Sequence, residues 1–563
     1  MKILGISAYY HDSASAIVID GEVKAAIAEE RLSRIKHDNS FPLLACSWCL
    51  DFCKLKLSDI DAVVFYEKPF LKFERILEST IYNAPQSFAR FLKAFPGWIG
   101  GKLNMRHLIK SQLKKLTKGE PKQVLFVEHH LAHAAFGYYT SGVNDAAILV
   151  VDAVGEKATT SFMKGDDHEI TILQEQNYPN SLGLLYSSFT QFLGFKVNSD
   201  EYKVMGLAPY GDAQSPQTQH FISIIEHQLV NVLPEGGIAL NMMYFDFSYR
   251  QRMINPSKWE KIFGIPYRAP GSEILQPHRN LASAIQSFTN KMGVMLASEV
   301  KKKIASQNLV ISGGCALNCV MNGIIKETGL YKNVFVPVDP GDAGCAIGAA
   351  LVVEHKMQRI MPYLGPEYDD GLIKDALVKS HLNFKQLSDE ELIHHVAEFI
   401  AQGKIVGWFQ GRMEFGPRAL GNRSILADCR KSEMKDKINR SVKFREPFRP
   451  FAPVVCCEDA ASYFGMDDSP YMMFTTNVMK STVPAITHED NTARPQTVSL
   501  DDNPKLYMLI KEYAKMTGIP VILNTSFNVM GEPIVCSPSD AINTFQNSGI
   551  DVLAIGNFII TKN

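Results

Sequence analysis

Two histidines spaced four residues apart, His129 and His133, are the side chains with the clearest capacity for chemistry. They lie in a run rich in Leu and Ala without Pro or Gly, which predicts a helix. Residues four apart share one face of a helix, so both imidazoles can reach one ion. A buried strand is expected over residues 146–151 and ends at Asp152, and buried parallel strands commonly present ligands at that end.

Imidazole and carboxylate ligands suit Fe²⁺, Mn²⁺ or Zn²⁺ better than Mg²⁺, which prefers oxygen ligands alone. The pattern therefore predicts a metal site at His129, His133 and Asp152. The alternative is a solvated helix whose histidines are unrelated. His130 lies about 100° round the helix from His129, so it does not easily join the same ion. We expect it to line the site or contact substrate, and a structural role is the other interpretation.

These residues need a large scaffold, and the composition is consistent with one. The chain has 563 residues, too many for one core, with 46% hydrophobic and 10% aromatic residues. Its formal net charge of −1 excludes a global attraction to nucleic acid or an anionic membrane, so any anion site must be local. No apolar run reaches the roughly 20 residues of a membrane span, and no signal-peptide pattern opens the chain. We expect a cytoplasmic enzyme with free cysteines.

Strands that end in glycine-rich or acidic turns recur through the first two-thirds of the chain. Hairpins are expected over residues 3–20 and 146–161, and a strand over 309–312 leads into Gly313 and Gly314. Such glycines let backbone N–H groups approach a nucleotide, and a following helix N-terminus favours its negative charge. The order of these elements matches the actin, sugar-kinase and heat-shock ATPase superfold, and the two hairpins suggest a distant internal duplication.

A second domain is expected after a boundary rich in proline and glycine, which divides the chain into 1–360 and 361–563. It is predicted to begin with a helix over 390–402 and a strand over 405–409. Basic residues on stiff Gly/Pro turns or among aromatic residues suit bidentate phosphate binding. Pairing of these arginines with acids such as Glu446 is the alternative. The residues in question are Arg418, Arg423, Lys443, Arg445, Arg449 and Arg494, with Asn524, Ser526 and Asn528 at the end of a strand.

Several ordered motifs carry a family resemblance that runs essentially end to end. They lie at residues 5–14, 29–42, 66–75 and 201–211, beside the histidine pair and the Gly313-Gly314 turn. The metal region resembles the tRNA threonylcarbamoyl-transferase domain, and the whole chain more closely resembles the NodU/CmcH/TobZ family of O-carbamoyltransferases. The resemblance implies an α/β fold: a two-lobed actin-like domain followed by a YrdC-like domain. One departure is Ala153, where the family usually has glycine; its methyl narrows the approach of a phosphate.

The resemblance also implies roles for single residues. Metal ligands would be His129, His133, Asp152 and, as a fourth, Asp342, with Fe²⁺ expected first and Mn²⁺ or Zn²⁺ as alternatives. Asp12 and Lys36, with His130, would act in catalysis or, with Glu67, contact the acceptor; surface charges are the other interpretation. Nucleotide and carbamoyl-adenylate would be bound by Gly155, Glu156, Lys203, Gly313, Gly314, Asn318, Arg418, Lys443, Arg445, Arg449, Arg494, Asn524, Ser526 and Asn528.

The implied activity uses carbamoyl phosphate and ATP, with Mg²⁺, to form carbamoyl-adenylate, and then transfers the carbamoyl group to a small-molecule hydroxyl. Acceptors in the family include sugars, antibiotics and other natural products. Residues 80–115 are expected to select the acceptor, or to be an ordinary amphipathic cover. No nucleic-acid or membrane partner is expected, and a homodimer is left open. Alternatives are a tRNA threonylcarbamoylation enzyme, a non-catalytic ATP-binding regulatory module and a sugar kinase, which would leave the histidines without a role.

Overall fold

The chain folds into two compact units in a computed structural model that describes residues 1–99, 101–116 and 119–562. The first unit comprises Met1–Glu29 and His37–Ile360, and the second comprises Glu30–Lys36 and Met361–Asn563. The boundary predicted at residue 360 placed residues 30–36 in the first domain, whereas the structure places them in the second unit. They belong to the second unit because Arg31 donates to the Gly416 carbonyl at 2.9 Å and Arg34 to the Pro533 carbonyl at 2.9 Å.

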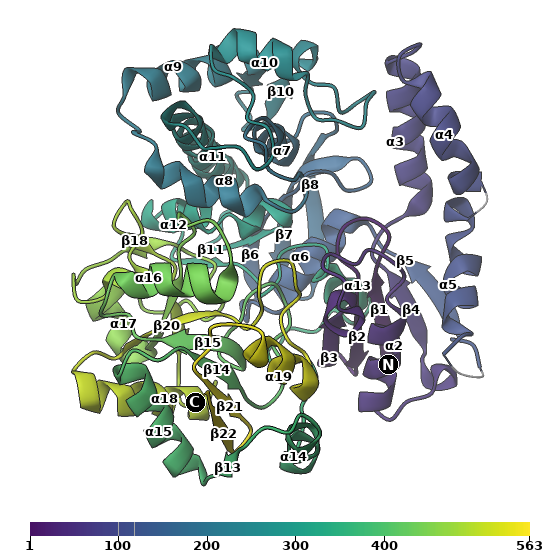
Figure 1. The fold of residues 1–563 in the computed structure, drawn as a ribbon. Helices are drawn as coiled ribbons and strands as arrows, with labels where there is room; N and C mark the ends of the chain where they lie inside the picture. Colours follow the sequence, from purple (N-terminus) through teal and green to yellow (C-terminus); the bar gives the residue numbers. More distant parts are fainter. Residues whose placement is uncertain (100, 117–118, 563) are drawn as a thin grey trace. The chain divides into compact units, whose positions relative to one another are not determined.

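Two five-stranded sheets of the same topology form the first unit (Figure 1). In each sheet the hairpin partners are antiparallel and the remaining strands are parallel. The first has the order β3-β2-β1-β4-β5: β1 (Lys2–Ser7), β2 (Ala14–Ile19), β3 (Glu22–Ala28), β4 (Ala62–Phe65) and β5 (Gln123–Phe126). The second has the order β12-β11-β6-β7-β8: β6 (Asp145–Val151), β7 (Ala158–Asp166), β8 (Glu169–Asn177), β11 (Asn308–Ser312) and β12 (Asn333–Phe335).

The repeated topology is the two-lobed actin-like architecture, and it confirms the predicted α/β fold of the first domain. The central strands β1 and β6 are buried along nearly their whole length. Unbroken apolar runs of this kind are typical of strands covered on both faces. The equal order and orientation of the two sheets is the internal duplication that the two hairpins suggested.

Two helices carry the residues of interest between these sheets. Helix α6 (His129–Tyr139) packs along α13 (Cys345–Glu354), and α13 also packs on β1. Glycine makes this close approach possible, because a Cβ at Gly348 would lie 1.9 Å from the Ala132 carbonyl oxygen. The contact brings the first turn of α6 near the loop that precedes α13.

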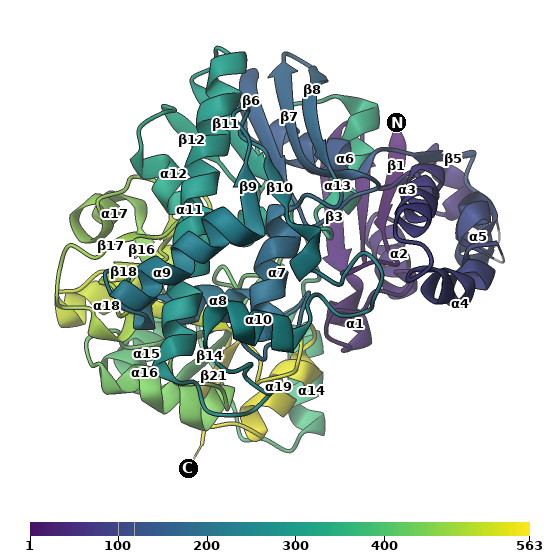
Figure 2. The same ribbon diagram turned by 90° about the horizontal axis from the view of Figure 1, so that it is seen from above.

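The other helices of this unit cover the two sheets. Three of them, α3, α4 and α5, gather beside β4 and β5 (Figures 1 and 2). The helices are α2 (Leu43–Phe52), α3 (Pro69–Tyr82), α4 (Phe88–Ile99), α5 (Met105–Leu113), α7 (Leu182–Phe192), α8 (Glu201–Leu207), α9 (Pro216–Ile224), α10 (Pro256–Phe263), α11 (Gln276–Lys303) and α12 (Cys319–Glu327). A small hairpin joins β9 (Val230–Val232) and β10 (Ile238–Leu240), and α1 (Glu29–Ser33) begins where the chain leaves this unit.

A mixed eight-stranded sheet forms the second unit, in the order β13-β22-β21-β14-β15-β20-β16-β19. Its strands are β13 (Lys385–Gln386), β14 (Val406–Phe409), β15 (Arg423–Ala427), β16 (Ala452–Cys456), β19 (Gln496–Val498), β20 (Val521–Ser526), β21 (Val552–Ile555) and β22 (Phe558–Thr561), with a separate pair β17 (Thr476–Asn477) and β18 (Thr492–Ala493). Its helices are α14 (Asp370–Lys379), α15 (Asp389–Ala401), α16 (Glu433–Ile438), α17 (Cys457–Phe464), α18 (Pro504–Thr517) and α19 (Pro538–Gln546).

The core of the second unit lies between this sheet and the paired helices α15 and α18. Trp408 of β14 and Tyr513 of α18 are among its fully buried side chains. Among the described residues, no helix has the length and apolar character required to cross a bilayer. The ten cysteines are all free thiols, as the composition predicted.

Candidate functional site

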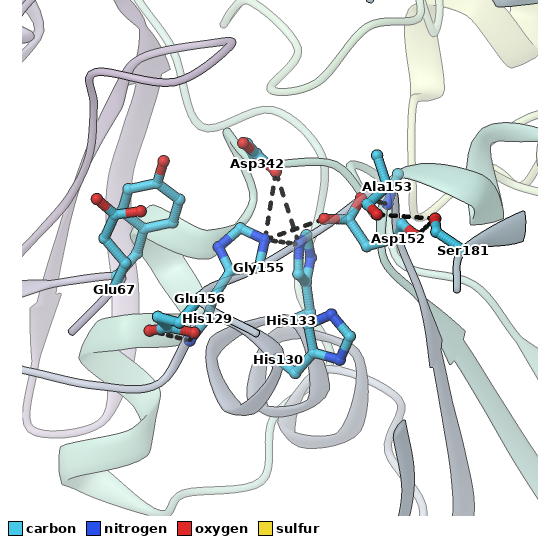
Figure 3. A network of polar contacts seen from close by, with 12 residues as sticks. Glu67, His129, His130, His133, Asp152, Ala153, Gly155, Glu156, Ser181 and Asp342 are labelled. Carbon is cyan, nitrogen blue, oxygen red and sulfur yellow. Dashed lines mark hydrogen bonds and ion pairs between the residues drawn. The ribbon is translucent and has the colours of Figure 1, made fainter. Parts of the chain in front are cut away.

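Four side chains from three separate segments meet in the first unit, at the N-terminal turn of α6 (Figure 3). His129 and His133 come from the same face of α6, Asp152 follows β6, and Asp342 precedes α13; all four are buried. The two Nε2 atoms lie 3.0 Å apart, and His129 Nε2 lies 3.3 Å from the Asp152 carboxylate. Asp342 Oδ1 lies 3.6 Å from His129 Nε2 and 3.7 Å from His133 Nε2.

This arrangement fits a shared divalent cation. Ligand atoms bound at about 2.1 Å to one ion are separated by about 3.0–3.4 Å in octahedral or tetrahedral geometry, close to the spacings here. Direct hydrogen bonds explain the cluster less well, because the single proton that His129 Nε2 can carry would have to serve His133, Asp152 and Asp342 together. Asp342 Oδ2 is also buried with no hydrogen-bond partner among the described residues. The donor set therefore suits Fe²⁺, Mn²⁺ or Zn²⁺, and it leaves the choice among them open.

The charges of the cluster also favour a bound cation. Burial opposes protonation of His129, but the hydrogen bond to Asp152 and the charge of Asp342 outweigh it and raise the His129 pKa to about 9. Burial by itself would raise the Asp152 pKa, yet the neighbouring histidines hold it well below its usual range. Two buried carboxylates thus favour positive charge between them, which a metal ion can supply in place of a proton.

Two glycines that the sequence assigned to nucleotide binding lie against these ligands. The Gly314 amide donates to Asp152 Oδ1 at 3.1 Å, and a Cβ at Gly314 would sit 2.8 Å from that oxygen. A Cβ at Gly155 would lie 3.0 Å from Cδ2 of His129. Gly313, which has a φ of +91°, completes the turn. These contacts orient the ligand side chains, as outer-shell groups do at metal sites.

The other polar residues expected at the nucleotide have protein partners in this structure. Glu156 accepts hydrogen bonds from the backbone amides of His129 at 3.0 Å and Lys68 at 2.7 Å, so it caps the start of α6. Lys203 pairs with Asp200 at 3.3 Å. Asn318 caps α12 by accepting from the Met321 amide and donates to Gln286 at 3.1 Å. Their roles toward a nucleotide stay predictions.

His130 does not belong to the four-residue cluster, and its ring points away from Asp342 (Figure 3). Its Nδ1 lies 2.6 Å from the Ser161 hydroxyl, which donates to Glu175 at 3.0 Å. Burial, reinforced by the charge of His129, lowers the His130 pKa to about 3. The ring is therefore neutral, with its proton on Nδ1 and a buried Nε2 that has no partner in the described part of the chain.

The three remaining candidates, Asp12, Glu67 and Lys36, come from separate segments of the chain. Asp12 lies between His11, at 2.6 Å, and His37, at 3.0 Å. Burial lowers the His11 pKa, but the bond to Asp12 outweighs it and brings the value to about 10. Glu67 is buried and pairs with Lys72 at 2.6 Å. Lys36 belongs to the second unit, whereas the predicted boundary placed it in the first domain, and its role toward an acceptor stays a prediction.

A second cluster forms in the second unit around the buried Lys443, the last residue of the π-helix η7 (Asn439–Lys443). Its Nζ donates to Asn528 Oδ1 at 2.9 Å, to Ser526 Oγ at 3.1 Å and to the Ser526 carbonyl. Burial, together with the charges of Arg445 and Arg449, lowers the Lys443 pKa well below its usual value. Three residues predicted from two separate motifs are thus in direct contact, in a field that favours an anion.

The arginines of this unit differ in their surroundings. Arg445 donates to Asn439 at 2.7 Å and lies over the Phe451 ring at 4.6 Å. Arg449 lies 3.7 Å from Glu446, the acid that the sequence offered as an alternative partner. Arg423 is fully buried and donates to backbone carbonyls, including those of Gln410 and Pro366, so its role is structural. Arg418 and Arg494 are half-buried on the loops that precede β15 and β19.

Asn524 makes a contact with Gln496 that the sequence did not indicate. Its amide nitrogen donates to Gln496 at 2.8 Å and to the Ala419 carbonyl at 3.2 Å, and its Oδ1 is buried without a partner among the described residues. Gln496 was not predicted as part of this cluster. Its position depends on β19 pairing with β16, and no local pattern carries that information.

The first unit is thus an actin-like α/β domain with a buried candidate metal centre, and the second is a mixed α/β domain with a buried basic cluster. Two family models match the chain, "Carbamoyltransferase N-terminus" over residues 2–351 and "Carbamoyltransferase C-terminus" over residues 397–562. The chain therefore belongs to the carbamoyltransferase family, and it is an enzyme of the transferase class. This confirms the resemblance stated from the motifs.

Relatives extend along the whole chain. An uncharacterized protein of Synechocystis, sll1178, is 42% identical over all of this chain and 96% of its own length. The nodulation protein NolNO of Sinorhizobium fredii is 36% identical over 98% of this chain and 79% of its own length. Among solved structures, component A of the (R)-2-hydroxyglutaryl-CoA dehydratase of Acidaminococcus fermentans matches 62% of this chain with 14% identity and a TM-score of 0.31, which is too low to support an inference.

Proposed function

We propose that this enzyme is an O-carbamoyltransferase that uses ATP and carbamoyl phosphate in two half-reactions, one in each unit. The observation that carries the proposal is the pair of buried clusters of opposite character. The acidic histidine cluster of the first unit suits a cation, and the basic cluster around Lys443 suits a polyanion. A metal-assisted transfer and a phosphate-consuming activation require these two environments.

The second unit would form carbamoyl-adenylate. Carbamoyl phosphate is first hydrolysed to carbamate and phosphate, and a carbamate oxygen then attacks the α-phosphorus of ATP, which releases pyrophosphate. Mg²⁺ would accompany the ATP. Lys443 would donate to phosphate oxygens, with Arg445 and Arg449 adding positive charge around them. Asn524 Oδ1 is a buried acceptor of the kind that a carbamoyl amide needs.

The first unit would transfer the carbamoyl group from the adenylate to an acceptor hydroxyl: the hydroxyl oxygen bonds to the carbonyl carbon, the bond from that carbon to the phosphate oxygen breaks, and AMP and the hydroxyl proton are released. A divalent ion held by His129, His133, Asp152 and Asp342 supplies Lewis-acid polarisation of a carbonyl oxygen. The Gly314 amide holds Asp152 in its orientation. His130, neutral and with Nε2 available, can accept a hydrogen bond from a bound substrate, and Asp12 with its two histidines offers charged contacts to the acceptor.

The test is a reconstitution with the purified full chain, ATP, carbamoyl phosphate and a panel of hydroxylated acceptors, including sugars and aminoglycosides. We expect AMP and pyrophosphate to form in a carbamoyl-phosphate-dependent manner. Mass spectrometry of the acceptor should show a gain of one carbamoyl group. A carbamoylated product that forms equally without ATP would contradict the adenylate route. Carbamoylation of bulk tRNA in place of the small acceptors would contradict the proposed acceptor class.

A further inference from the structure

The region that the sequence offered as an acceptor-selecting element carries an uneven charge. Between Ser79 and Gly119 there is no Asp or Glu, while eight Lys or Arg occur: Arg90, Lys93, Lys102, Arg106, Lys110, Lys114, Lys115 and Lys118. The formal net charge of the whole chain is −1, so the +8 of this segment is balanced by −9 elsewhere. The sequence thus concentrates positive charge in this segment, which the average charge of the chain conceals.

Helix α4 carries one broad apolar stripe, made of an inner face that is packed and an adjoining outer face that is exposed. On the inner face, Phe91 and Phe95 contact each other with ring centroids 5.0 Å apart, and Trp98 packs on Phe73 of α3 at 5.5 Å. On the outer face, Phe88 and Leu92 are each 54% exposed. Packing within the unit explains the inner face only.

An apolar groove continues this outer face onto α3. It has a volume of about 290 Å³ and is lined by Leu77, Thr80, Ile81, Ala84, Phe88 and Phe91. At the end of α3, Ile81 is 74% exposed and Tyr82 is 88% exposed. Large apolar side chains clustered at this exposure mark a surface that contacts another apolar phase.

The neighbouring helix α5 contributes the basic part of the same region (Figures 1 and 2). Met105, Ile109 and Leu113 are buried and attach α5 to the unit, whereas Arg106 and Lys114 are exposed. Lys93 of α4 is exposed as well. Glu120 pairs with Lys110 and Lys114, at 3.2 and 2.6 Å, and is the nearest acid along the chain after this segment.

We propose that α3, α4 and α5 form a membrane-surface anchor that binds an anionic phospholipid bilayer. Exposed aromatic and aliphatic side chains beside Lys and Arg are the composition of helices that lie in the lipid headgroup region. Anionic headgroups attract the basic residues, and the outer face of α4 enters the boundary with the acyl chains. The sequence-based expectation of no membrane partner relied on the average charge, from which this segment departs.

Two other occupants are less consistent with these features. A second copy docked by this same face would bring the basic segments of both copies together, and like charges repel across a twofold interface. A nucleic acid would satisfy the basic residues but would leave the aliphatic part of the groove without an apolar partner. The bilayer surface accounts for both the charge and the exposed apolar side chains.

Vesicle co-sedimentation of the full chain tests the proposal. We expect binding to vesicles of phosphatidylcholine and phosphatidylserine at 7:3, weaker binding to phosphatidylcholine alone, and a decrease as salt is raised. Because each basic residue near the surface contributes about a fivefold change in binding, K93A/R106A should weaken it about twenty-five-fold. F88S/L92S should weaken it at least about tenfold, through lost apolar contact.

Matched controls change similar side chains elsewhere. L372S/V378S replaces two exposed apolar residues of α14, and K302A/K303A removes two exposed lysines at the end of α11. Both should bind vesicles as the unaltered chain does, and circular dichroism melting should show all four variants folded. Equal binding by all variants, or binding that ignores lipid charge, would overturn the proposal. A dimer in sedimentation equilibrium that the F88S/L92S variant dissociates would also overturn the proposal. So would a tRNA gel shift that K93A/R106A abolishes, if the unaltered chain does not bind vesicles.

Discussion

The two buried clusters of this enzyme favour ligands of opposite charge. Around His129 and His133, two carboxylates raise the proton affinity of an imidazole, so the first unit favours an added cation. Around Lys443, burial and neighbouring arginines lower the proton affinity of an amine, so the second unit favours an added anion. Each cluster is electrostatically incomplete by itself, and the missing charge identifies the class of ligand that it can bind.

Removal of a metal ligand tests the difference between the two clusters most directly. H129A should reduce carbamoyl transfer about a thousandfold or more, because Lewis-acid stabilisation contributes several kcal/mol. Release of pyrophosphate from ATP and carbamoyl phosphate in the first turnover, which reports adenylate formation, should stay within about threefold of the unaltered enzyme. Mass spectrometry of the acceptor and a pyrophosphate assay measure the two steps. Equal loss of both half-reactions would contradict the division of labour, and H395A, at a partly exposed histidine of α15, is the control.

The reciprocal change is K443M in the second unit. Loss of several charge-assisted hydrogen bonds should lower pyrophosphate release about a hundredfold. Metal content, measured by inductively coupled plasma mass spectrometry, should not change. K437M replaces a lysine of α16 that is more exposed and serves as the control. A K443M variant that has lost its metal but still forms the adenylate would reverse the assignment of the two units.

The pH dependence of metal affinity tests whether the histidine cluster exchanges a proton for a metal ion. The His129 pKa of about 9 in the absence of metal means that a proton occupies the imidazole through neutral pH. A metal must displace this proton, so apparent affinity should fall about tenfold for each unit that pH decreases below about 9. Titration of the metal-depleted protein with Mn²⁺ or Zn²⁺ at pH 6.5, 7.5 and 8.5 measures this slope. An affinity independent of pH would show that His129 is not a ligand.

A smaller effect is expected from G314A. The added methyl would lie 2.8 Å from Asp152 Oδ1 and should displace this ligand, lowering metal affinity and transfer about tenfold. G97A, where an added methyl meets nothing within 4 Å, should leave both unchanged. If G314A instead weakened ATP binding while metal affinity stayed constant, the nucleotide role first assigned to Gly314 would be the correct one.

Local patterns predicted the elements well. The strand expected over 146–151 and the helix expected over 390–402 correspond to β6 (Asp145–Val151) and α15 (Asp389–Ala401). Both follow from short-range periodicity, and α15 also begins with a capping box formed by Ser388 and Glu391. Helical spacing likewise placed His129 and His133 on one face of α6. The fold class and the family followed from the order of such segments.

The sequence did not predict which residues contact one another in the folded chain. Gly314 was expected to contact a nucleotide, and the sequence did not indicate that its amide also holds the metal-ligand candidate Asp152. Arg423 was considered for anion binding, and it donates to backbone carbonyls. Gln496 gave no local signal at all. A residue type limits which bonds a side chain can form, but its neighbours come from strands and loops far away in the chain.

The amino-acid sequence by itself therefore determined the secondary structure, the repeated α/β plan and the paired imidazoles, because these depend on neighbours a few residues apart. Asp342 was implied by the family resemblance, and only the tertiary structure decided that its carboxylate lies beside both histidines. Only the tertiary structure likewise decided that Lys443 contacts Ser526 and Asn528, and that residues 30–36 pack with the second unit. Such contacts depend on how closely whole elements approach, as at Gly348, and this distance is set by packing between segments that lie hundreds of residues apart.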